Sequence, residues 1–199
     1  MPYVAQISRV NPACVLILVD QSGSMGQPFG NTKGSNKDSV VADAVNRLIQ
    51  NLVLRSAKAD GIRDYFQVGV LGYGQKIETL YGGRIPYDVL RPISQIGVAP
   101  LRIEDRVRVT QDADGNPVES KYKFPVWYDS KSTGRTPMVE AVSAAVLAVR
   151  GFVETYPNAF PPLVLNLTDG IPTDGNPQEM AKTLRGLSTS DGNVLMFNV

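Results

Sequence analysis

The sequence predicts an α/β protein with a doubly wound, mostly parallel sheet flanked by helices, a Rossmann-like architecture. Two patterns indicate this class. Short apolar runs typical of buried strands alternate with longer segments of helical periodicity. Alternation of this kind is typical of strand–helix–strand units, in which the connecting helix leaves its two strands parallel. One segment, at about 79–133, breaks the alternation and is interpreted as an insertion.

Four apolar segments predict the strands of the sheet. Residues 14–20 are aliphatic or β-branched on both faces, which favours a central strand covered on both sides. Residues 65–73 predict the next strand, although their glycines weaken the pattern. Residues 163–167 and 194–199 predict two later strands. The chain therefore alternates strands with the helices described next.

Three segments predict helices. Residues 38–58 and 137–156 each carry an apolar stripe at helical spacing. Pro137 opens the second of these, where a first-turn proline is tolerated. The third helix is expected from Asn176, an N-cap residue followed by proline, to about residue 187.

The insertion at about 79–133 predicts a β-hairpin. Two alternating runs, 103–110 and 118–127, flank a turn expected at Asp114-Gly115. We expect the whole chain to form a single domain that carries this hairpin between its second strand and its second helix.

The composition excludes several classes of function. The chain of 199 residues has a net charge of +1, so no nucleic acid or membrane partner is expected from charge. No apolar run approaches the roughly 20 residues that span a bilayer, and the N-terminus lacks the layout of a signal peptide. The single cysteine, Cys14, lies in an apolar run and fits a reducing compartment. These features predict a cytoplasmic protein.

The chain contains no histidine, which constrains its chemistry further. A Ser-His-Asp or Cys-His catalytic arrangement is excluded, and so is a zinc site with histidine ligands.

Oxygen-bearing side chains cluster where the first predicted strand ends. Asp20 ends this strand, and Ser22 and Ser24 follow at alternating positions. Hard divalent cations such as Mg²⁺ are held by carboxylates, hydroxyls and water. A plain loop in which these side chains cap backbone groups is the alternative interpretation.

Two further residues strengthen the metal interpretation. Thr136 precedes the helix start at Pro137, and Asp169 directly follows the strand predicted at 163–167. Ligands of doubly wound sheets bind at the carboxyl ends of the strands, so Asp20 and Asp169 are expected at one edge.

With these residues the sequence resembles the von Willebrand factor type A (VWA) family, whose metal-ion-dependent adhesion site has the pattern Asp-x-Ser-x-Ser, then a threonine, then an aspartate. The matching residues are Asp20, Ser22, Ser24, Thr136 and Asp169. The resemblance covers most of residues 12–199 outside the insertion and is nearest to the bacterial intracellular members. It implies bound Mg²⁺, with Mn²⁺ or Ca²⁺ as alternatives, and a protein partner that supplies an Asp or Glu carboxylate. The family continues with a further helix and edge strand, which we expect to be missing from this chain.

Two further residues, Arg135 and Asp174, are candidates for binding the partner, and each has an alternative role. Arg135 stands where relatives often have glycine, and it either steers an acidic partner or is simply solvated. Asp174 is either a turn or cap residue or a residue that supports the metal ligands from outside.

These features are compatible with three functions. The leading one is a non-enzymatic, metal-dependent protein-interaction module. The alternative is a metal-assisted phosphatase or hydrolase, which lacks a second acid because Ser22 stands at its place. The resemblance also implies a third function, in which the domain is the adhesion part of a larger assembly, either ATPase-associated or of the stress and tellurite-resistance type. The chain has no P-loop, so a partner would perform any ATP hydrolysis. The partner's identity and the oligomeric state stay open.

Overall fold

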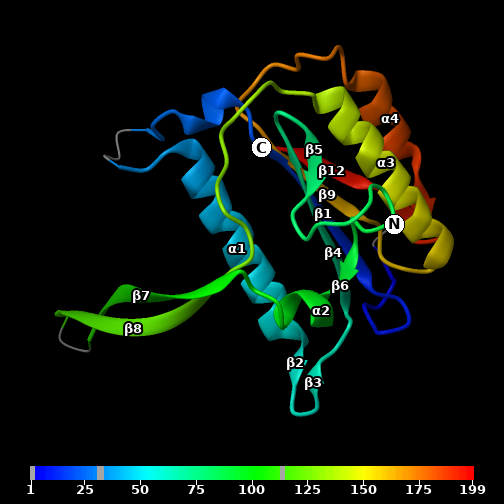
Figure 1. Cartoon of the computed structure of the whole chain (residues 1–199). Coiled ribbons are helices and arrows are strands. Elements are labelled where there is room, and N and C mark those ends of the chain that lie inside the picture. Colours follow the sequence, from blue (N-terminus) through cyan, green and yellow to red (C-terminus); the bar gives the residue numbers. More distant parts are fainter. Residues whose placement is uncertain (1–2, 31–33, 113–114) are drawn as a thin grey trace.

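A computed structural model describes residues 3–30, 34–112 and 115–199 of the chain (Figure 1). The long strands are β1 (Ala13–Asp20), β4 (Phe66–Tyr73), β7 (Arg102–Gln111), β8 (Pro117–Val126), β9 (Leu163–Leu167) and β12 (Leu195–Asn198). The short strands are β2 (Ala57–Lys58), β3 (Gly61–Ile62), β5 (Ile77–Thr79), β6 (Arg91–Pro92), β10 (Ser188–Thr189) and β11 (Gly192–Asn193). The helices are α1 (Lys37–Ser56), α2 (Ile93–Gly97), α3 (Met138–Thr155) and α4 (Gln178–Gly186), with a 3₁₀ turn, η1, at Gly23–Gly26. The predicted strands and helices all form, with bounds shifted by a residue or two.

The main sheet has the order β12-β9-β1-β4-β5, and β6 pairs with β4 off this path. The strands β12, β9, β1 and β4 are parallel, whereas β5 and β6 run antiparallel to β4. The α/β class is therefore confirmed, and the sheet is mixed. In the described part of the chain, three two-stranded sheets stand apart from it.

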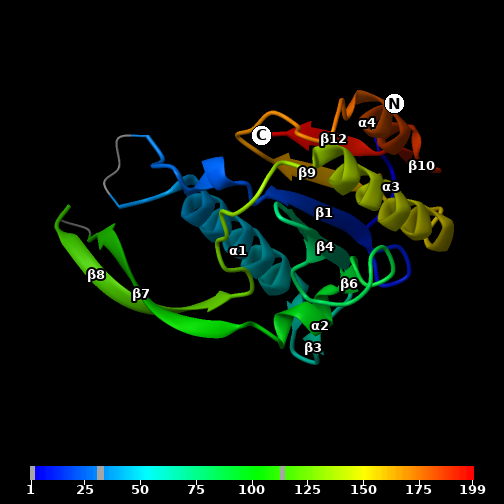
Figure 2. The same cartoon turned by 45° about the horizontal axis from the view of Figure 1, so that its top comes forward.

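Helices cover both faces of the main sheet (Figure 2). Leu16 and Leu18 of β1 pack with α3 and α4, whereas Val15, Ile17 and Val19 face α1 and α2. Successive residues of a strand point to opposite faces, so an apolar strand buried on both sides needs such a double cover. The eight residues of β1 are all buried, as the sequence predicts for a central strand.

The glycines that weaken the predicted strand at 65–73 have a packing reason. A Cβ atom added to Gly69 would lie 2.7 Å from the carbonyl oxygen of Val89. This strand forms β4, beside β1, and glycine lets the chain around Val89 cross close to it.

Residues 79–133 contain more than the predicted hairpin. They also hold β6 and α2, and the buried side chains of Ile93 and Ile96 join the core beneath α1. Elements of two and five residues are too short to give a periodic signal, which is why sequence patterns miss them.

The predicted hairpin forms as β7 and β8, paired over ten residues from Arg102↔Val126 to Gln111↔Pro117. Of its predicted turn, Asp114 lies outside the described residues, and Gly115 has φ +84°. The hairpin projects from the body of the molecule beside α1 (Figures 1 and 2).

The base of the hairpin is anchored to α1 through Asn46, whose exposed fraction is 2%. Its Oδ1 accepts the backbone N–H groups of Trp127 (2.7 Å) and Tyr128 (3.0 Å). Its Nδ2 donates to the carbonyl oxygens of Tyr128 (2.8 Å) and Ala42 (2.9 Å). One side chain thus satisfies several buried backbone groups where the hairpin joins the core.

An ion pair adds to this anchor further along the hairpin. The Arg106 guanidinium bonds Asp43 of α1 and lies 3.6 Å from the centre of the Phe124 ring. Partial burial opposes ionisation of Asp43, but Arg47 and Arg106 together hold the pKa of this carboxyl below its ordinary value.

Within the described residues, no helix combines the length and the apolar character required to cross a membrane.

Candidate metal centre

The loop after β1 holds Asp20 in one orientation. Its side chain is buried, with an exposed fraction of 1%. Oδ1 accepts the backbone N–H of Ser22 at 2.8 Å, and Oδ2 accepts the hydroxyl of Thr168 at 2.6 Å. Asp20 is therefore a fixed carboxylate at the carboxyl end of the sheet's central strand.

The loop after β9 meets this one, as the strand ends predict. Ser24 Oγ donates to Asp169 Oδ1 at 2.8 Å, although the two residues are 145 positions apart. Ser22 Oγ lies 3.0 Å from Ser24 Oγ, so a run of oxygens connects the first loop to the third. Ser22 is buried, whereas Ser24 and Asp169 are more accessible.

Thr136 brings the second loop to the same place. A Cβ atom added to Gly170 would lie 3.3 Å from both Thr136 Oγ1 and Asp20 Oδ2. These two oxygens therefore flank the backbone next to Asp169. The backbone of Thr136 is fixed from the other side, because its N–H donates to Thr173 Oγ1 and its carbonyl accepts the N–H of Thr173.

Backbone hydrogen bonds hold the first and second loops together. The N–H of Gly23 donates to the carbonyl of Gly134 (3.2 Å), and the N–H of Thr133 donates to that of Gln21 (2.6 Å). Gly134 has φ +91°, and a Cβ there would lie 2.5 Å from the backbone nitrogen of Gln75. Only glycine fits this crossing without strain.

The structure thus brings together all five predicted metal ligands: Asp20, Ser22, Ser24, Thr136 and Asp169. Two carboxylates and three hydroxyls are oxygen donors of the kind that hard cations select. The space at Gly170, which a side chain would fill, lies between two of these donors. The residues present therefore fit a small divalent ion.

Lys37 is a neighbour that sequence reasoning missed. Its Nζ lies 2.5 Å from Asp169 Oδ2. Partial burial raises the pKa of Asp169, but the contacts with Lys37 and Ser24 outweigh it and lower the pKa below its ordinary value. The two residues are 132 positions apart, and no local pattern links them. Thr168, which orients Asp20, stood in the sequence directly before Asp169 but had no assigned role.

Tyr73 supports the site from beneath without serving as an anionic ligand. The residue is fully buried at the end of β4, opposite Asp20 in the register. Burial raises the pKa of its hydroxyl, with the nearby Asp20 charge acting in the same direction. The neutral hydroxyl donates to Asn166 Oδ1 at 2.8 Å.

The two candidate partner-binding residues lie on a groove of about 430 Å³ beside the Thr136 loop. Arg135 is exposed, and its guanidinium has no hydrogen bond or ion pair within residues 3–30, 34–112 and 115–199. Asp174 caps α3, because its carboxylate oxygens accept the N–H groups of Val139 (3.1 Å) and Glu140 (2.9 Å). The cap interpretation of Asp174 is therefore confirmed.

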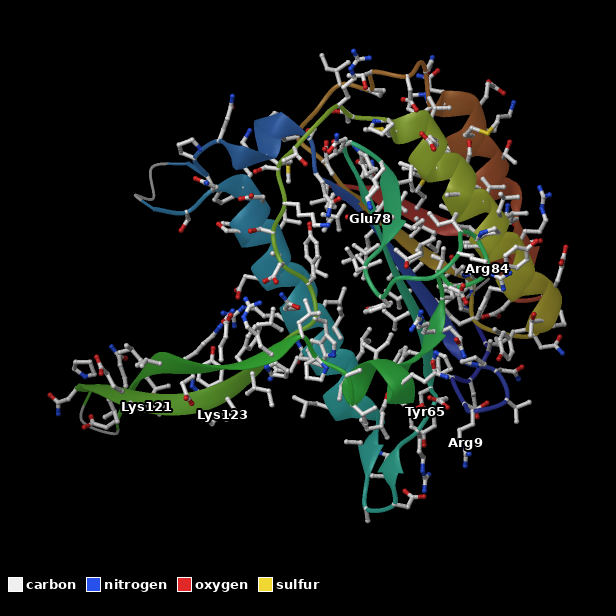
Figure 3. The ribbon with its side chains drawn as sticks, in the orientation of Figure 1. Arg9, Tyr65, Glu78, Arg84, Lys121 and Lys123 are labelled. Carbon is white, nitrogen blue, oxygen red and sulfur yellow. The ribbon has the colours of Figure 1, made fainter. Side chains whose placement is uncertain are left out.

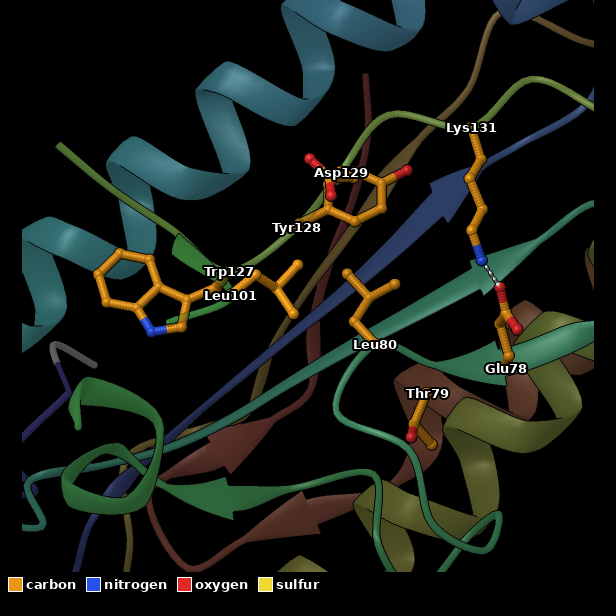
Figure 4. A pocket seen from close by; sticks show the side chains of 8 residues that line it. All are labelled: Glu78, Thr79, Leu80, Leu101, Trp127, Tyr128, Asp129 and Lys131. Carbon is orange, nitrogen blue, oxygen red and sulfur yellow. Dashed lines mark hydrogen bonds and ion pairs between the residues drawn. The ribbon is translucent and has the colours of Figure 1, made fainter. Parts of the chain in front are cut away.

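A second pocket, of about 240 Å³, lies between β5 and the chain that leaves the hairpin (Figure 4). Lys131 forms an ion pair with Glu78 on one side of it. Asp129, also in its wall, pairs with Arg102 at 2.6 Å. None of the predicted metal ligands lines this pocket, and each of its charged side chains has an ion-pair partner.

Among the described residues, no three or more His, Cys, Asp or Glu side chains form a group that could hold a metal ion. The predicted site has only two carboxylates and relies on hydroxyl oxygens, so it differs in kind from such a cluster.

No protein-family model and no curated protein matches the chain. Solved structures with a partial likeness include the PilB minor pilin from Streptococcus sanguinis, at 12% identity and a TM-score of 0.47. This chain is covered to 81% and the pilin to 31%. Another is the vWF domain of the type V pili tip protein Mfa5 from Porphyromonas gingivalis, at 14% identity and a TM-score of 0.43, covering 82% of this chain and 39% of that one. The chain thus spans well under half the length of either protein, and its fold and site are described from its own topology and contacts.

Proposed function

We propose that the chain is a metal-dependent protein-interaction module of the VWA type. In this proposal, Asp20, Ser22, Ser24, Thr136 and Asp169 hold Mg²⁺, with Mn²⁺ or Ca²⁺ as alternatives. The ion then captures an Asp or Glu carboxylate of a protein partner. The observation that carries the proposal is the meeting of three distant loops, in which Ser24 Oγ lies 2.8 Å from Asp169 Oδ1.

The donor set explains why such an ion would accept a further anion. Hydroxyls are neutral donors, and only two carboxylates supply negative charge, so a bound Mg²⁺ keeps Lewis acidity toward an anionic ligand. Asp20 is buried and held by Ser22 and Thr168, whereas Ser24 and Asp169 are accessible. The site is therefore rigid on its inner side, and on its outer side a partner would reach Ser24 and Asp169 once Lys37 leaves Asp169.

The surroundings support capture rather than catalysis. The sequence has no histidine to act as a base, and the buried Tyr73 hydroxyl stays neutral. The exposed Arg135 lies on the groove next to Thr136, where its charge, unpaired among the described residues, would attract an acidic partner. We therefore propose that Arg135 contacts the partner, whereas Asp174 keeps α3 in place.

We also propose the type of domain and the cellular compartment in which it works. Parallel central strands with helices on both faces support a doubly wound VWA-type domain, with 79–133 as its insertion. The resemblance to the VWA family and the single cysteine carry the further proposal of a bacterial cytoplasmic complex, such as a stress-signalling or ATPase-associated assembly.

The proposal is tested in two steps. Titration calorimetry with Mg²⁺ and Mn²⁺ is expected to show one binding site per chain. Beads carrying a short aspartate peptide are then expected to retain the chain in Mg²⁺ and release it in excess chelator. Matched beads with asparagine in place of aspartate are the control. A chain that binds no divalent ion, or that is retained equally on both beads, would refute the proposal.

Lys37 provides a prediction about metal affinity. Lys37→Met is expected to tighten Mg²⁺ binding by about tenfold, because the ammonium both occupies Asp169 and repels a nearby cation. Calorimetry on the variant measures the change. Lys131→Met, which removes an ammonium paired with Glu78 instead, is the matched control and should leave the affinity unchanged. Weaker Mg²⁺ binding by Lys37→Met would show that Lys37 supports the site.

A further inference from the structure

The hairpin formed by β7 and β8, here called the arm, is an isolated two-stranded ribbon. It projects from the body of the molecule (Figures 1 and 2). In the described part of the chain, β8 pairs with β7 alone, so its other edge has no strand partner. Open edges present unpaired N–H and C=O groups to any matching strand, and a two-stranded ribbon gains stability from further strands.

The hydrogen-bond phase of the arm fixes which residues face the open edge of β8. At its tip the N–H of Asp112 donates to the carbonyl of Asn116 at 3.0 Å. Hydrogen-bonded and non-bonded pairs alternate along an antiparallel ladder, so the even-numbered residues of β8 bond β7. The odd-numbered residues direct their N–H and C=O groups outward. Pro117 and Pro125 are both odd-numbered, which agrees with this phase because proline cannot donate to a ladder.

The prolines leave three outward N–H donors between them, at Glu119, Lys121 and Lys123. The Lys123 ammonium forms an ion pair with Asp105 of β7 at 2.7 Å. Glu119 and Lys121 lie opposite valines of β7, and neither has a charged partner among the described residues. Figure 3 shows Lys121 and Lys123 on the arm, away from the body of the molecule. The edge therefore carries one unpaired negative and one unpaired positive side chain, two positions apart.

We propose that the arm joins two copies of this chain, through antiparallel pairing of their β8 edges about a two-fold axis at Ser120. In this register Glu119 of each copy lies opposite the partner's Lys121. On the other face, Val118 lies opposite the partner's Tyr122. Opposite charges and aliphatic–aromatic pairs are both favourable cross-strand neighbours, and the two-fold axis makes every pair occur twice.

Charge distinguishes this register from its neighbours on β8. An axis at Glu119 or at Lys121 would place that charged residue opposite the same residue of the partner. An axis at Tyr122 would place Lys121 opposite the partner's Lys123. Like charges directly opposite are destabilising, so the axis at Ser120 is favoured.

The edge of β7 is a poorer match for a second copy. An axis at Val107, in the middle of β7, would place Arg106 opposite the partner's Arg108. Arg106 is also committed to Asp43 of α1. We therefore place the pairing at β8, where a two-fold axis gives a closed dimer.

The first experiment exchanges the two charges. Sedimentation velocity over a range of concentration is expected to show a monomer–dimer equilibrium for the unmodified chain. Glu119→Lys and Lys121→Glu are each expected to shift the equilibrium to monomer and to raise the dissociation constant of the dimer by at least about tenfold. An equal mixture of the two variants is expected to dimerise again, because each Lys then faces a Glu. The inference is independent of the metal site, so the runs are made in chelator.

The second experiment fixes the register. The two copies of residue 120 would form a non-bonded pair, with Cα atoms about 4.5 Å apart, within the roughly 4.4–6.8 Å that a disulfide spans. Ser120→Cys is therefore expected to give a disulfide-linked dimer under mild oxidation. Cys14 is buried and will not compete. Ser130→Cys, exposed outside the arm, is the matched control and should give little product.

Four results would overturn the inference, and the first three concern the dimer itself. These are a chain that is monomeric throughout, a dimer that neither charge variant weakens, and Ser120→Cys cross-linking no faster than Ser130→Cys. Assemblies that grow beyond a dimer would also contradict it, because they require pairing through β7.

Discussion

Asp20→Asn is expected to weaken Mg²⁺ and Mn²⁺ binding by about a hundredfold or more while the fold survives. Asparagine has the shape of aspartate and keeps an Oδ1 acceptor for the Ser22 N–H. Its amide would face Thr168, whose hydroxyl can accept as readily as it donates. The negative charge is the property that changes. Because Asp20 is one of only two carboxylates at the site, that loss removes half of the charge that attracts the cation.

Titration calorimetry measures the affinity, and circular dichroism with thermal unfolding checks the fold. Asp174→Asn is the matched control, since its carboxylate caps α3 and touches no predicted metal ligand. This control should bind Mg²⁺ normally. Undiminished binding by Asp20→Asn would place the ion elsewhere and remove the basis of the proposed function.

The second large effect concerns stability. Asn46→Ala is expected to lower the free energy of unfolding by about 3 kcal/mol, because several buried polar groups lose their partners together. The N–H groups of Trp127 and Tyr128 and the carbonyl of Tyr128 all bond this one side chain. Water cannot replace it freely, since Asn46, Trp127 and Tyr128 are each at most 3% exposed.

Urea unfolding measures the loss as a change in midpoint at constant slope. Asn51→Ala, an exposed position on the same helix, is the control and should change stability by less than about 0.5 kcal/mol. An Asn46→Ala chain as stable as this control would show that the hairpin base does not depend on the Asn46 side chain.

Long periodic segments were predictable because local pattern and tertiary burial agree in them. The helix predicted at 137–156 forms as α3, since its apolar stripe is the face that packs on the sheet. The two-residue β6 and the five-residue α2 were missed, because they exist only through contacts with β4 and α1. Their residues become ordered by packing, which a local window of sequence does not contain.

The candidate site likewise contains residues that the sequence predicted and residues that it missed. Asp20 and Asp169 were predicted to meet because the carboxyl ends of parallel strands share one edge, and Ser24 indeed bonds Asp169. Lys37 was missed, since contact between residues 132 positions apart depends on how α1 is placed against β9. Asn46 was missed for a similar reason. Its hydrogen-bond partners lie in the hairpin base, so the sequence of α1 alone does not reveal its role.

The sequence by itself determined the strand and helix order, the hairpin and the identity of five oxygen donors, because these depend on local periodicity and on a topological rule. The tertiary structure alone decided that Lys37 competes for Asp169, that Asn46 holds the hairpin and that one edge of β8 stays open. These features depend on distances between segments remote in the chain, and such distances are set by the packing of the whole domain.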